Sequence, residues 1–171
     1  MKTQPTIGSN VEQIKHDNLQ FEVRRGRRPL SLLPQQPRSL LLSPPAQVWD
    51  LGGQANLRPS WAQYFTATDA VIVVVDSTDR ARVGIVRGEL QTLLRSEHLA
   101  KACILIYANK QDLPDAMPVA ELSEALELVT IKTHNWHVQQ SCAVTGEGLL
   151  DGLQWIAQRL RNSAKPAAAP P

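Results

Sequence analysis

The chain has 171 residues, a net charge of +2, 43% hydrophobic residues and 20% charged residues, as an ordinary globular protein of one domain does. Its apolar runs are far shorter than the roughly 20 residues of a membrane-spanning helix, and no apolar signal-peptide core follows the first residues, so we expect no direct membrane anchor in this chain. Its two cysteines, Cys103 and Cys142, do not predict a disulfide framework and fit a reducing, cytoplasmic setting.

The first part of the chain is predicted to form two short strands followed by an irregular insertion. Residues 11–15 and 19–23 are strand-like and flank a turn-prone centre. Residues 24–47 hold five arginines, five prolines and no acid. Because proline lacks the N–H and clashes with regular structure, we predict a disordered Arg/Pro-rich insertion there. A solvated loop is favoured over a nuclear signal or a nucleic-acid contact, since no aromatic residue is interleaved, and we expect no nucleic-acid partner.

The rest of the chain alternates between strands and helices. Apolar or β-branched runs predict strands at 48–51, 70–76, 102–108 and 136–142, with 70–76 and 102–108 buried on both faces. Apolar residues at helical spacing predict helices at 83–94, 119–128 and 149–160. Residues 162–171, with three prolines, are predicted to be a disordered tail. This alternation predicts an α/β protein with a mostly parallel sheet, in which ligands bind at the carboxyl ends of the strands.

The first strand-end motif is Asp50-Leu51-Gly52-Gly53-Gln54. An aspartate at this place can hold a magnesium ion through water. The two glycines let the backbone approach a phosphate closely and bond it through an N–H. A glutamine beside them can orient an attacking water. The alternative is a tight turn with a solvated glutamine.

The second motif, Asn109-Lys110-Gln111-Asp112, follows the strand at 102–108. An aspartate can accept hydrogen bonds from N1–H and the exocyclic amine of guanine, a donor pattern that adenine lacks. The asparagine can bond the other edge of the base and tie neighbouring loops, and the lysine stem can lie over the purine face. This spacing after a buried strand favours a guanine site over a plain polar turn.

The third motif is Ser141-Cys142-Ala143, where the backbone N–H of Ala143 is placed to bond the guanine O6. Other candidate sites carry less weight. His134 and His137 lie three residues apart, but no third metal ligand is evident. Both cysteines are interpreted as core or pocket-edge thiols, since the sequence places no histidine to activate them.

With these motifs in order, the chain resembles the ADP-ribosylation factor (Arf) and Arf-like small GTPases, and most closely the Arf-like five subgroup, its plant-type members included. The similarity runs from residue 5 to about 160 and leaves out 24–47. It rests on residues 5–12 as switch I, 48–54 as the last interswitch strand and switch II, and the two guanine motifs. The resemblance implies a P-loop NTPase-like small GTPase fold, with a mostly parallel sheet and helices on both faces.

The resemblance also implies roles for individual residues. Thr6 and Asp50 would hold Mg²⁺, the Gly53 N–H would meet the γ-phosphate and Gln54 would position the catalytic water. Trp49 and Tyr64 match two of three aromatic effector positions, and Ser9 occupies the third. The residues implied to bind the guanine nucleotide are Asn109, Lys110, Asp112, Cys142 and Ala143.

At the level of the cell, the resemblance implies a GTP/GDP switch in vesicle and membrane traffic. Its partners would be an exchange factor, a GTPase-activating protein and effectors. Family members are cytoplasmic and associate with the Golgi and other internal membranes.

Two departures from the family pattern change this expectation. The phosphate-binding motif GxxxxGK[ST] occurs nowhere in the 171 residues. We therefore expect an incomplete domain over 1–161 that lacks the first strand, the P-loop and the first helix. Removing 24–48 would join Phe21-Glu22-Val23 to Trp49-Asp50 as one continuous strand, so the insertion resembles a translated intron.

Three hypotheses stay open: an Arf-like switch that is defective in this chain, a non-hydrolysing remnant that acts as a protein-binding or decoy module, and an unrelated α/β nucleotide-binding protein. The guanine motif disfavours the third.

Overall fold

The computed structural model describes residues 11–16, 19–25 and 46–164, and the chain divides into two compact units, 1–64 and 65–171. The smaller unit contains a three-stranded sheet of β1 (Val11–His16), β2 (Leu19–Arg25) and β3 (Ala46–Asp50), followed by the 3-10 helix η2 (Arg58–Tyr64). β1 and β2 are antiparallel, and β2 and β3 are parallel.

The described strands correct the predicted insertion at its two ends. β2 continues through Arg25 and β3 begins at Ala46, so residues at both ends of the 24–47 segment belong to strands. The continuous strand expected for a chain without residues 24–48 stays a prediction, and in this chain the two flanking segments are separate strands. They pair side by side, with Val23 opposite Val48, because parallel pairing satisfies the backbone groups of both. Residues 26–45 lie outside the described part of the chain, and the disorder predicted for them stays a prediction.

The larger unit is an all-parallel sheet with the order β4-β5-β6. Its strands are β4 (Ala70–Asp76), β5 (Cys103–Asn109) and β6 (Trp136–Gln140), and its α-helices are α1 (Val83–Leu94), α2 (Val119–Ala125) and α3 (Leu149–Ala164). Short 3-10 helices lie at Arg80–Arg82, Glu97–Leu99 and Leu128–Thr130. Strand and helix alternate as predicted, because parallel strands need crossover connections.

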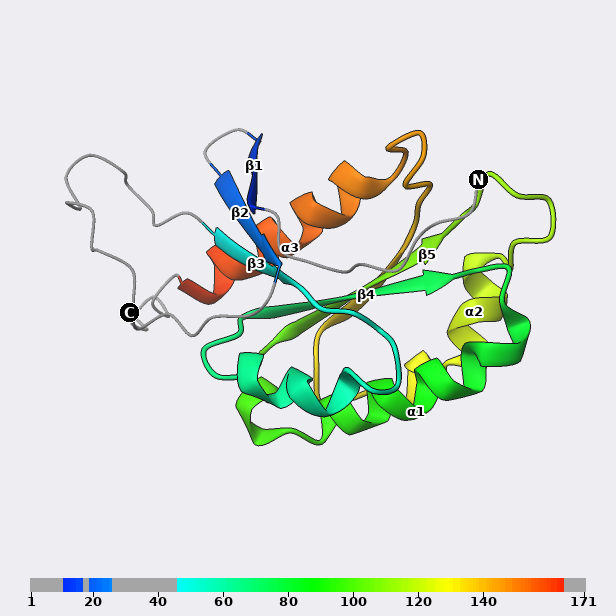
Figure 1. The fold of residues 1–171 in the computed structure, drawn as a ribbon, viewed down its shortest axis with the longest axis horizontal. Helices are drawn as coiled ribbons and strands as arrows, with labels where there is room; N and C mark the ends of the chain where they lie inside the picture. Colours follow the sequence, from blue (N-terminus) through cyan, green and yellow to red (C-terminus); the bar gives the residue numbers. More distant parts are fainter. Residues whose placement is uncertain (1–10, 17–18, 26–45, 165–171) are drawn as a thin grey trace, which may run out of the picture. The chain divides into compact units, whose positions relative to one another are not determined.

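Helices cover both faces of this sheet, as Figure 1 shows. One core packs α1 and α2 against β4 and β5 and includes Leu90, Ile104, Ile106 and Leu122. The other packs α3 against the opposite face through Leu105, Tyr107 and Ile156. The period-2 alternation of β5 therefore sends successive apolar side chains into two different cores, and Ile104, Leu105 and Ile106 are fully buried. The predicted α/β class with helices on both faces is confirmed.

The prediction that the strand at 70–76 is buried on both faces is wrong for its middle. Val74 is 64% exposed, although it lies within a run of β-branched residues. The physical reason is the face on which it lies: Val74 follows Ala70 and Ile72 at period 2, and those two pack against the α3 core, but that core does not extend to Val74. A continuous apolar run thus predicted the strand correctly but not the burial of each of its residues.

Two helix ends also differ from the prediction. α2 ends at Ala125, short of the predicted end at residue 128, and Glu127 has a left-handed backbone with φ of 56° that no helix can continue through. α3 runs on to Ala164, so the predicted disordered tail begins too early. Neither proline nor glycine occurs between Leu160 and Pro166, so neither ends the helix there. The Ser163 hydroxyl donates to the Arg159 carbonyl at 3.0 Å.

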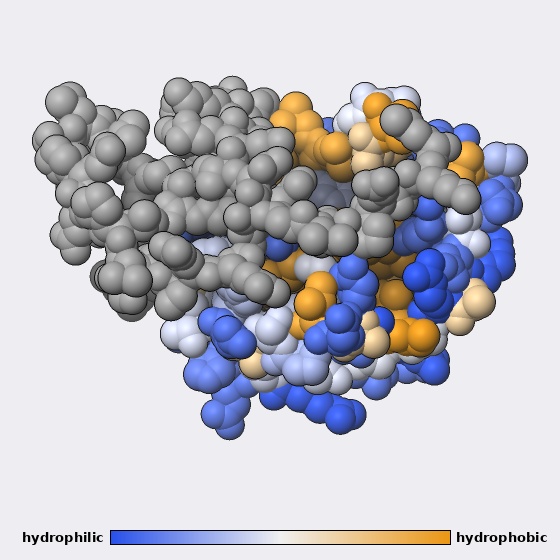
Figure 2. Space-filling view, in the orientation of Figure 1, coloured by the Kyte–Doolittle hydropathy of each residue, from blue (hydrophilic) through white to orange (hydrophobic). Residues whose placement is uncertain are grey.

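Hydrophilic residues dominate the outer rim of the larger unit. Figure 2 shows blue residues along the lower and right-hand rim, where α1 and α2 lie, and orange residues nearer the middle. This is the pattern of amphipathic helices that pack one face inward. Among the described residues, no helix has both the length and the apolar character that a membrane crossing requires.

Candidate functional site

The carboxyl ends of β4, β5 and β6 bring three polar segments to one edge of the sheet. Asp76 lies opposite Asn109 in the parallel register, and Ala108 lies opposite Gln140. The segments after these strands begin at Ser77, Lys110 and Ser141. Two of them are the guanine motifs identified in the sequence, so the fold places Asn109–Asp112 beside Ser141–Ala143.

Asn109 ties the two guanine motifs together. Its Oδ1 accepts a hydrogen bond from the Ala143 N–H at 2.9 Å and one from the Ser141 hydroxyl at 3.5 Å. The Gln111 N–H donates to the Ser141 carbonyl at 3.1 Å, and the Ser141 N–H donates to the Ala108 carbonyl at 2.9 Å. The tying role expected of the asparagine is therefore present. The Ala143 N–H, expected to face guanine O6, is engaged by Asn109 in this structure.

The other predicted base-site residues differ in exposure. The Asp112 side chain is exposed, so its carboxylate is open to a ligand. Cys142 is 2% exposed, its N–H donates to the Glu147 carbonyl and its carbonyl accepts from the Gly146 N–H. Cys142 therefore shapes the loop from inside, and the nucleotide contact predicted for it stays a prediction.

Gly148 fixes the end of the third segment. Its φ is +72°, and a Cβ there would lie 1.9 Å from the carbonyl oxygen of Gln140. Only glycine fits such a close approach of two backbone segments without strain. The Tyr107 hydroxyl, which donates to the Leu149 carbonyl, anchors the first turn of α3 directly after it.

Lys110 makes a contact that the sequence reasoning missed. Its Nζ lies 2.6 Å from Oδ2 of Asp76, the last residue of β4. The other carboxylate oxygen, Oδ1, accepts from the Thr78 N–H at 3.0 Å and from the Thr78 hydroxyl at 2.7 Å. The sequence did contain a signal for Asp76, because an aspartate that ends a parallel strand lies at the edge of the sheet where ligands bind. Asp76 and Thr78 are thus added to the candidate site.

In the smaller unit, side-chain donors hold residues 50–54, here called the DLGGQ segment. The Trp61 Nε1–H donates to the Gly52 carbonyl at 3.1 Å, and the Arg58 Nε–H donates to the Gly53 carbonyl at 3.0 Å. Gln54 is exposed, and its Oε1 lies over Gly52, where a Cβ would be 2.6 Å away. Asp50 ends β3 and is half-buried. Thr6 lies outside the described residues.

The two aromatic residues that match effector positions are in contact. The rings of Trp49 and Tyr64 have centroids 5.2 Å apart and are tilted by 52°. Both are half-buried. Such tilted pairs stabilise one another beyond the area they bury.

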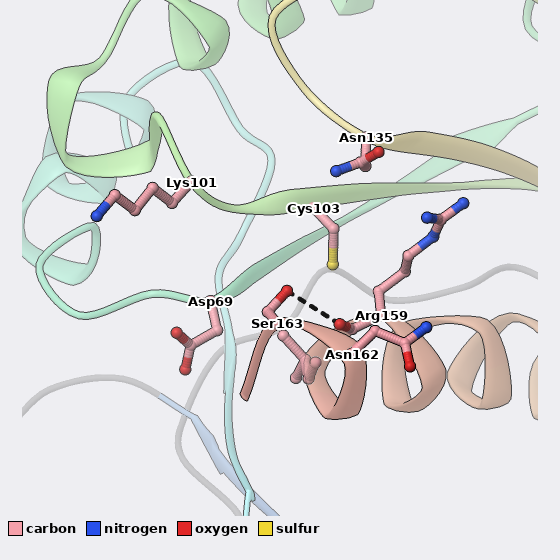
Figure 3. Close-up of a pocket in the computed structure, with 8 residues that line it drawn as sticks. Asp69, Lys101, Cys103, Asn135, Arg159, Asn162 and Ser163 are labelled. Carbon is pink, nitrogen blue, oxygen red and sulfur yellow. Dashed lines mark hydrogen bonds between the residues drawn. The ribbon is translucent and has the colours of Figure 1, made fainter. Parts of the chain in front are cut away.

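A hollow of about 200 Å³ lies at the opposite end of the strands and is not the predicted site. Figure 3 shows it beside the start of β5 and the last turns of α3, with the Cys103 sulfur pointing into it. Burial raises the pKa of the Cys103 thiol, which leaves it protonated at neutral pH. The interpretation of Cys103 as a pocket-edge thiol fits this position. Its lining residues are Asp69, Lys101, Cys103, Asn135, Arg159, Leu160, Asn162 and Ser163.

The described residues contain no cluster of three or more His, Cys, Asp or Glu side chains suited to a metal ion. His134 uses both ring nitrogens, one with the Thr133 hydroxyl at 2.8 Å and one with the Leu99 carbonyl at 3.0 Å. His137 stacks on Trp155 instead, with centroids 5.3 Å apart. Both imidazole rings are thus engaged with other groups, and the sequence interpretation that they are not a metal pair stays a prediction.

Known proteins with similar sequences and structures agree with the motifs. Residues 45–160 match the ADP-ribosylation factor family. ADP-ribosylation factor-like protein 5A of Mus musculus is 48% identical over 159 residues, which are 93% of this chain and 75% of the mouse protein. ADP-ribosylation factor-like protein 5 of Dictyostelium discoideum is 45% identical over 163 residues, 95% of this chain and 75% of that protein.

A solved structure extends the agreement to the fold. The Arl6 BBS3 small GTPase from Trypanosoma brucei, with the bound nucleotide analogue GppNp, superposes with a TM-score of 0.73 at 28% identity. The match covers 94% of this chain and 84% of the trypanosome chain. The sequence match, the parallel sheet and the strand-end motifs lead to one conclusion: the chain belongs to the ADP-ribosylation factor family and has a small GTPase fold.

Proposed function

We propose that the protein is a GTP/GDP switch of vesicle and membrane traffic that works in the cytoplasm and at the Golgi or other internal membranes. Its partners are a guanine-nucleotide exchange factor, a GTPase-activating protein and effectors. The observation that supports this most directly is the assembly of the two guanine motifs, in which Asn109 Oδ1 accepts from the Ala143 N–H at 2.9 Å.

The base half of the site consists of the two loops that Asn109 joins. The exposed Asp112 carboxylate accepts from N1–H and the exocyclic amine of guanine, and adenine offers no such pair of donors. Lys110 lays its aliphatic stem over the purine face. A site of this kind rejects the wrong base because one of its polar groups would be left unpaired.

The phosphate half is incomplete in residues 1–171, which contain no GxxxxGK[ST] motif. The groups proposed for it are the Gly53 N–H for the γ-phosphate, Gln54 for the attacking water, and Thr6 with Asp50 for Mg²⁺. The hydroxyl and carboxylate oxygens of Thr6 and Asp50 are the donors that Mg²⁺ prefers. When bound, the ion neutralises phosphate charge. We propose that the 171 residues alone bind GTP weakly and are defective in hydrolysis, because the phosphates carry most of the ligand's charge.

Titration of the 171-residue chain with guanosine and adenosine, followed by NMR chemical shifts, tests the base half without relying on the phosphates. We expect guanosine to bind more tightly. Asp112→Asn should remove this preference at a cost of about 1–3 kcal/mol, since it replaces an acceptor by a donor. Asp115→Asn, a change at an exposed acid three residues further on, is the matched control and should leave the preference intact. Equal affinity for the two nucleosides in the parent chain would refute the base site.

Calorimetry with GTP and Mg²⁺ on the same chain tests the phosphate half. Micromolar or tighter binding would show that the groups within residues 1–171 suffice for the phosphates. Binding no tighter than that of guanosine supports the proposed defect.

The contact between Trp49 and Tyr64 supports a second candidate, a non-hydrolysing protein-binding or decoy module. If the packed rings hold an effector surface in place, binding of an effector does not require GTP hydrolysis. The two functions differ in one measurement. A switch binds an Arf-family effector only with GTP present, whereas a decoy binds it equally with GTP, GDP or no nucleotide. Trp49→Ala should abolish either interaction.

A further inference from the structure

An ion pair joins two neighbouring strand ends within the base site. Asp76 ends β4, Asn109 ends β5, and the two are paired in the sheet register. The residue after Asn109 is Lys110, whose Nζ lies 2.6 Å from Asp76 Oδ2. The Ser77 N–H also donates to the Asn109 carbonyl at 3.0 Å. The backbones that carry the two charged side chains are therefore fixed relative to one another.

Lys110 starts from a strained backbone. Its φ is 67°, in the left-handed region that residues other than glycine rarely adopt. Such a conformation persists only where the surroundings determine it, and it is found most often at functional sites. Here the Leu113 N–H donates to the Lys110 carbonyl at 3.1 Å, which closes the turn. From this backbone the lysine side chain reaches the end of β4, where its Nζ meets Asp76.

The carboxylate that receives the lysine is itself oriented. The Thr78 N–H and hydroxyl both donate to Asp76 Oδ1, at 3.0 and 2.7 Å, which leaves Oδ2 for the ammonium group. Burial alone raises the pKa of the Asp76 carboxyl, but the hydrogen bonds from Lys110 and Thr78 outweigh it and hold the pKa below the ordinary 3.8. The acceptor is therefore charged and fixed in direction at neutral pH.

This ion pair differs from three others in the same unit, Arg80–Glu121, Arg82–Asp79 and Arg87–Glu127. Those pairs involve helix or helix-entry residues, their arginine side chains are 42–70% exposed, and pairs with such exposed members contribute little to stability. The side chains of Lys110 and Asp76 are 38% and 30% exposed, and both residues lie at the edge of the sheet where ligands bind. A lysine stem has several rotatable bonds. Ordering it on binding costs conformational entropy, unless the stem is already ordered in the free protein.

We propose that Asp76 is a positioning residue of the base site: it holds the Lys110 ammonium so that the lysine stem is already ordered when a purine arrives. The proposal rests on the proposed guanine-nucleotide function. Asp76 acts on the base only through Lys110. Thr78 supports it by fixing the direction of the carboxylate.

The test measures guanosine and inosine affinities of the 171-residue chain by NMR titration. Asp76→Asn should weaken guanosine binding about two- to tenfold, the effect of ordering one long side chain on binding. The guanosine-to-inosine ratio should stay constant, because a stem over the purine face does not read the exocyclic amine. Asp79→Asn is the matched control. It changes a nearby acid that pairs with Arg82 and should leave both affinities unchanged.

A double-mutant cycle shows whether Asp76 acts through the lysine. Lys110→Met keeps an apolar stem but removes the ammonium, so Asp76→Asn should have no further effect in the Lys110→Met background. Additive losses, or an Asp76→Asn chain that binds like the parent, would overturn the proposal. If Asp76→Asn does not fold, Thr78→Val serves in the same cycle, since it removes only one hydrogen bond to the carboxylate. A parent chain without preference for guanosine over adenosine would refute the base site itself and this proposal with it.

Discussion

The base-site loops and the DLGGQ segment are held in place by different kinds of contact. In the larger unit, backbone bonds continue the strand pairing into the loops, from the Gln111 N–H to the Ser141 carbonyl and from the Ser141 N–H to the Ala108 carbonyl, and the Asn109 side chain adds a bond from the Ala143 N–H. In the smaller unit, the carbonyls of Gly52 and Gly53 accept hydrogen bonds from the side chains of Trp61 and Arg58. Side-chain donors can rotate away without breaking a strand pair, whereas the backbone bonds at Ser141 extend the strand pairing itself. The comparison indicates a preassembled pair of loops in the larger unit and, in the smaller unit, a segment that local contacts can release.

The strongest test of the preassembled loop is Gly148→Ala. A Cβ would lie 1.9 Å from the Gln140 carbonyl oxygen at a φ of +72°. We expect the free energy of unfolding to fall by roughly 2–4 kcal/mol. The measurement is urea unfolding followed by circular dichroism. Gly88→Ala on α1 is the control: apart from the helix's own backbone, no atom lies within 4 Å of the Cβ that alanine would add, and alanine in a helix should stabilise the chain by about 0.5–1 kcal/mol. Equal stability of the two variants would contradict a fixed loop.

Tyr107 tests the anchor of α3 that follows this loop. Burial raises its pKa to about 12. Because the folded pKa lies above the ordinary value of 10, this group's contribution to stability is complete below pH 10 and is lost as the pH rises toward 12.

The phenolate absorbance of Tyr64→Phe, in which Tyr107 is the remaining tyrosine of the two, measures this titration directly. Tyr107→Phe should remove the hydrogen bond to Leu149 and lower stability by about 0.5–1.5 kcal/mol. Titration of Tyr107 near pH 10 in the folded chain would argue against the buried anchor.

An effect no larger than that of Tyr107→Phe is expected for Trp61→Phe in the DLGGQ segment. The change keeps an aromatic ring but removes the donor to the Gly52 carbonyl, a loss of about 0.5–1.5 kcal/mol. Hydrogen exchange by mass spectrometry should show faster exchange in the peptide spanning 50–64, with no change in 141–148. Faster exchange in both peptides would show that the two regions open as one unit, against the comparison drawn above.

Local sequence patterns predicted most elements and the positions of both polar loops after β5 and β6. β5 and α1 follow from uninterrupted apolar periodicity, and Asn109 was expected to tie neighbouring loops, as it does. The errors arose where a position depends on distant residues. Val74 has the side chain of a buried strand but lies where the α3 core no longer covers its face, and Arg25 continues a strand within a segment predicted to be irregular from its composition. Composition averages over a window, whereas pairing is decided residue by residue.

The sequence by itself determined the family, the α/β class and the chemistry of the strand-end motifs, because these depend on residue types at short spacing. Only the tertiary structure revealed that Asp76 meets Lys110, 34 positions along the chain, and that the Ala143 N–H is engaged by Asn109. The physical reason is the parallel register. It places residues that are far apart in sequence at hydrogen-bonding distance, and no local pattern records which donor will reach which acceptor.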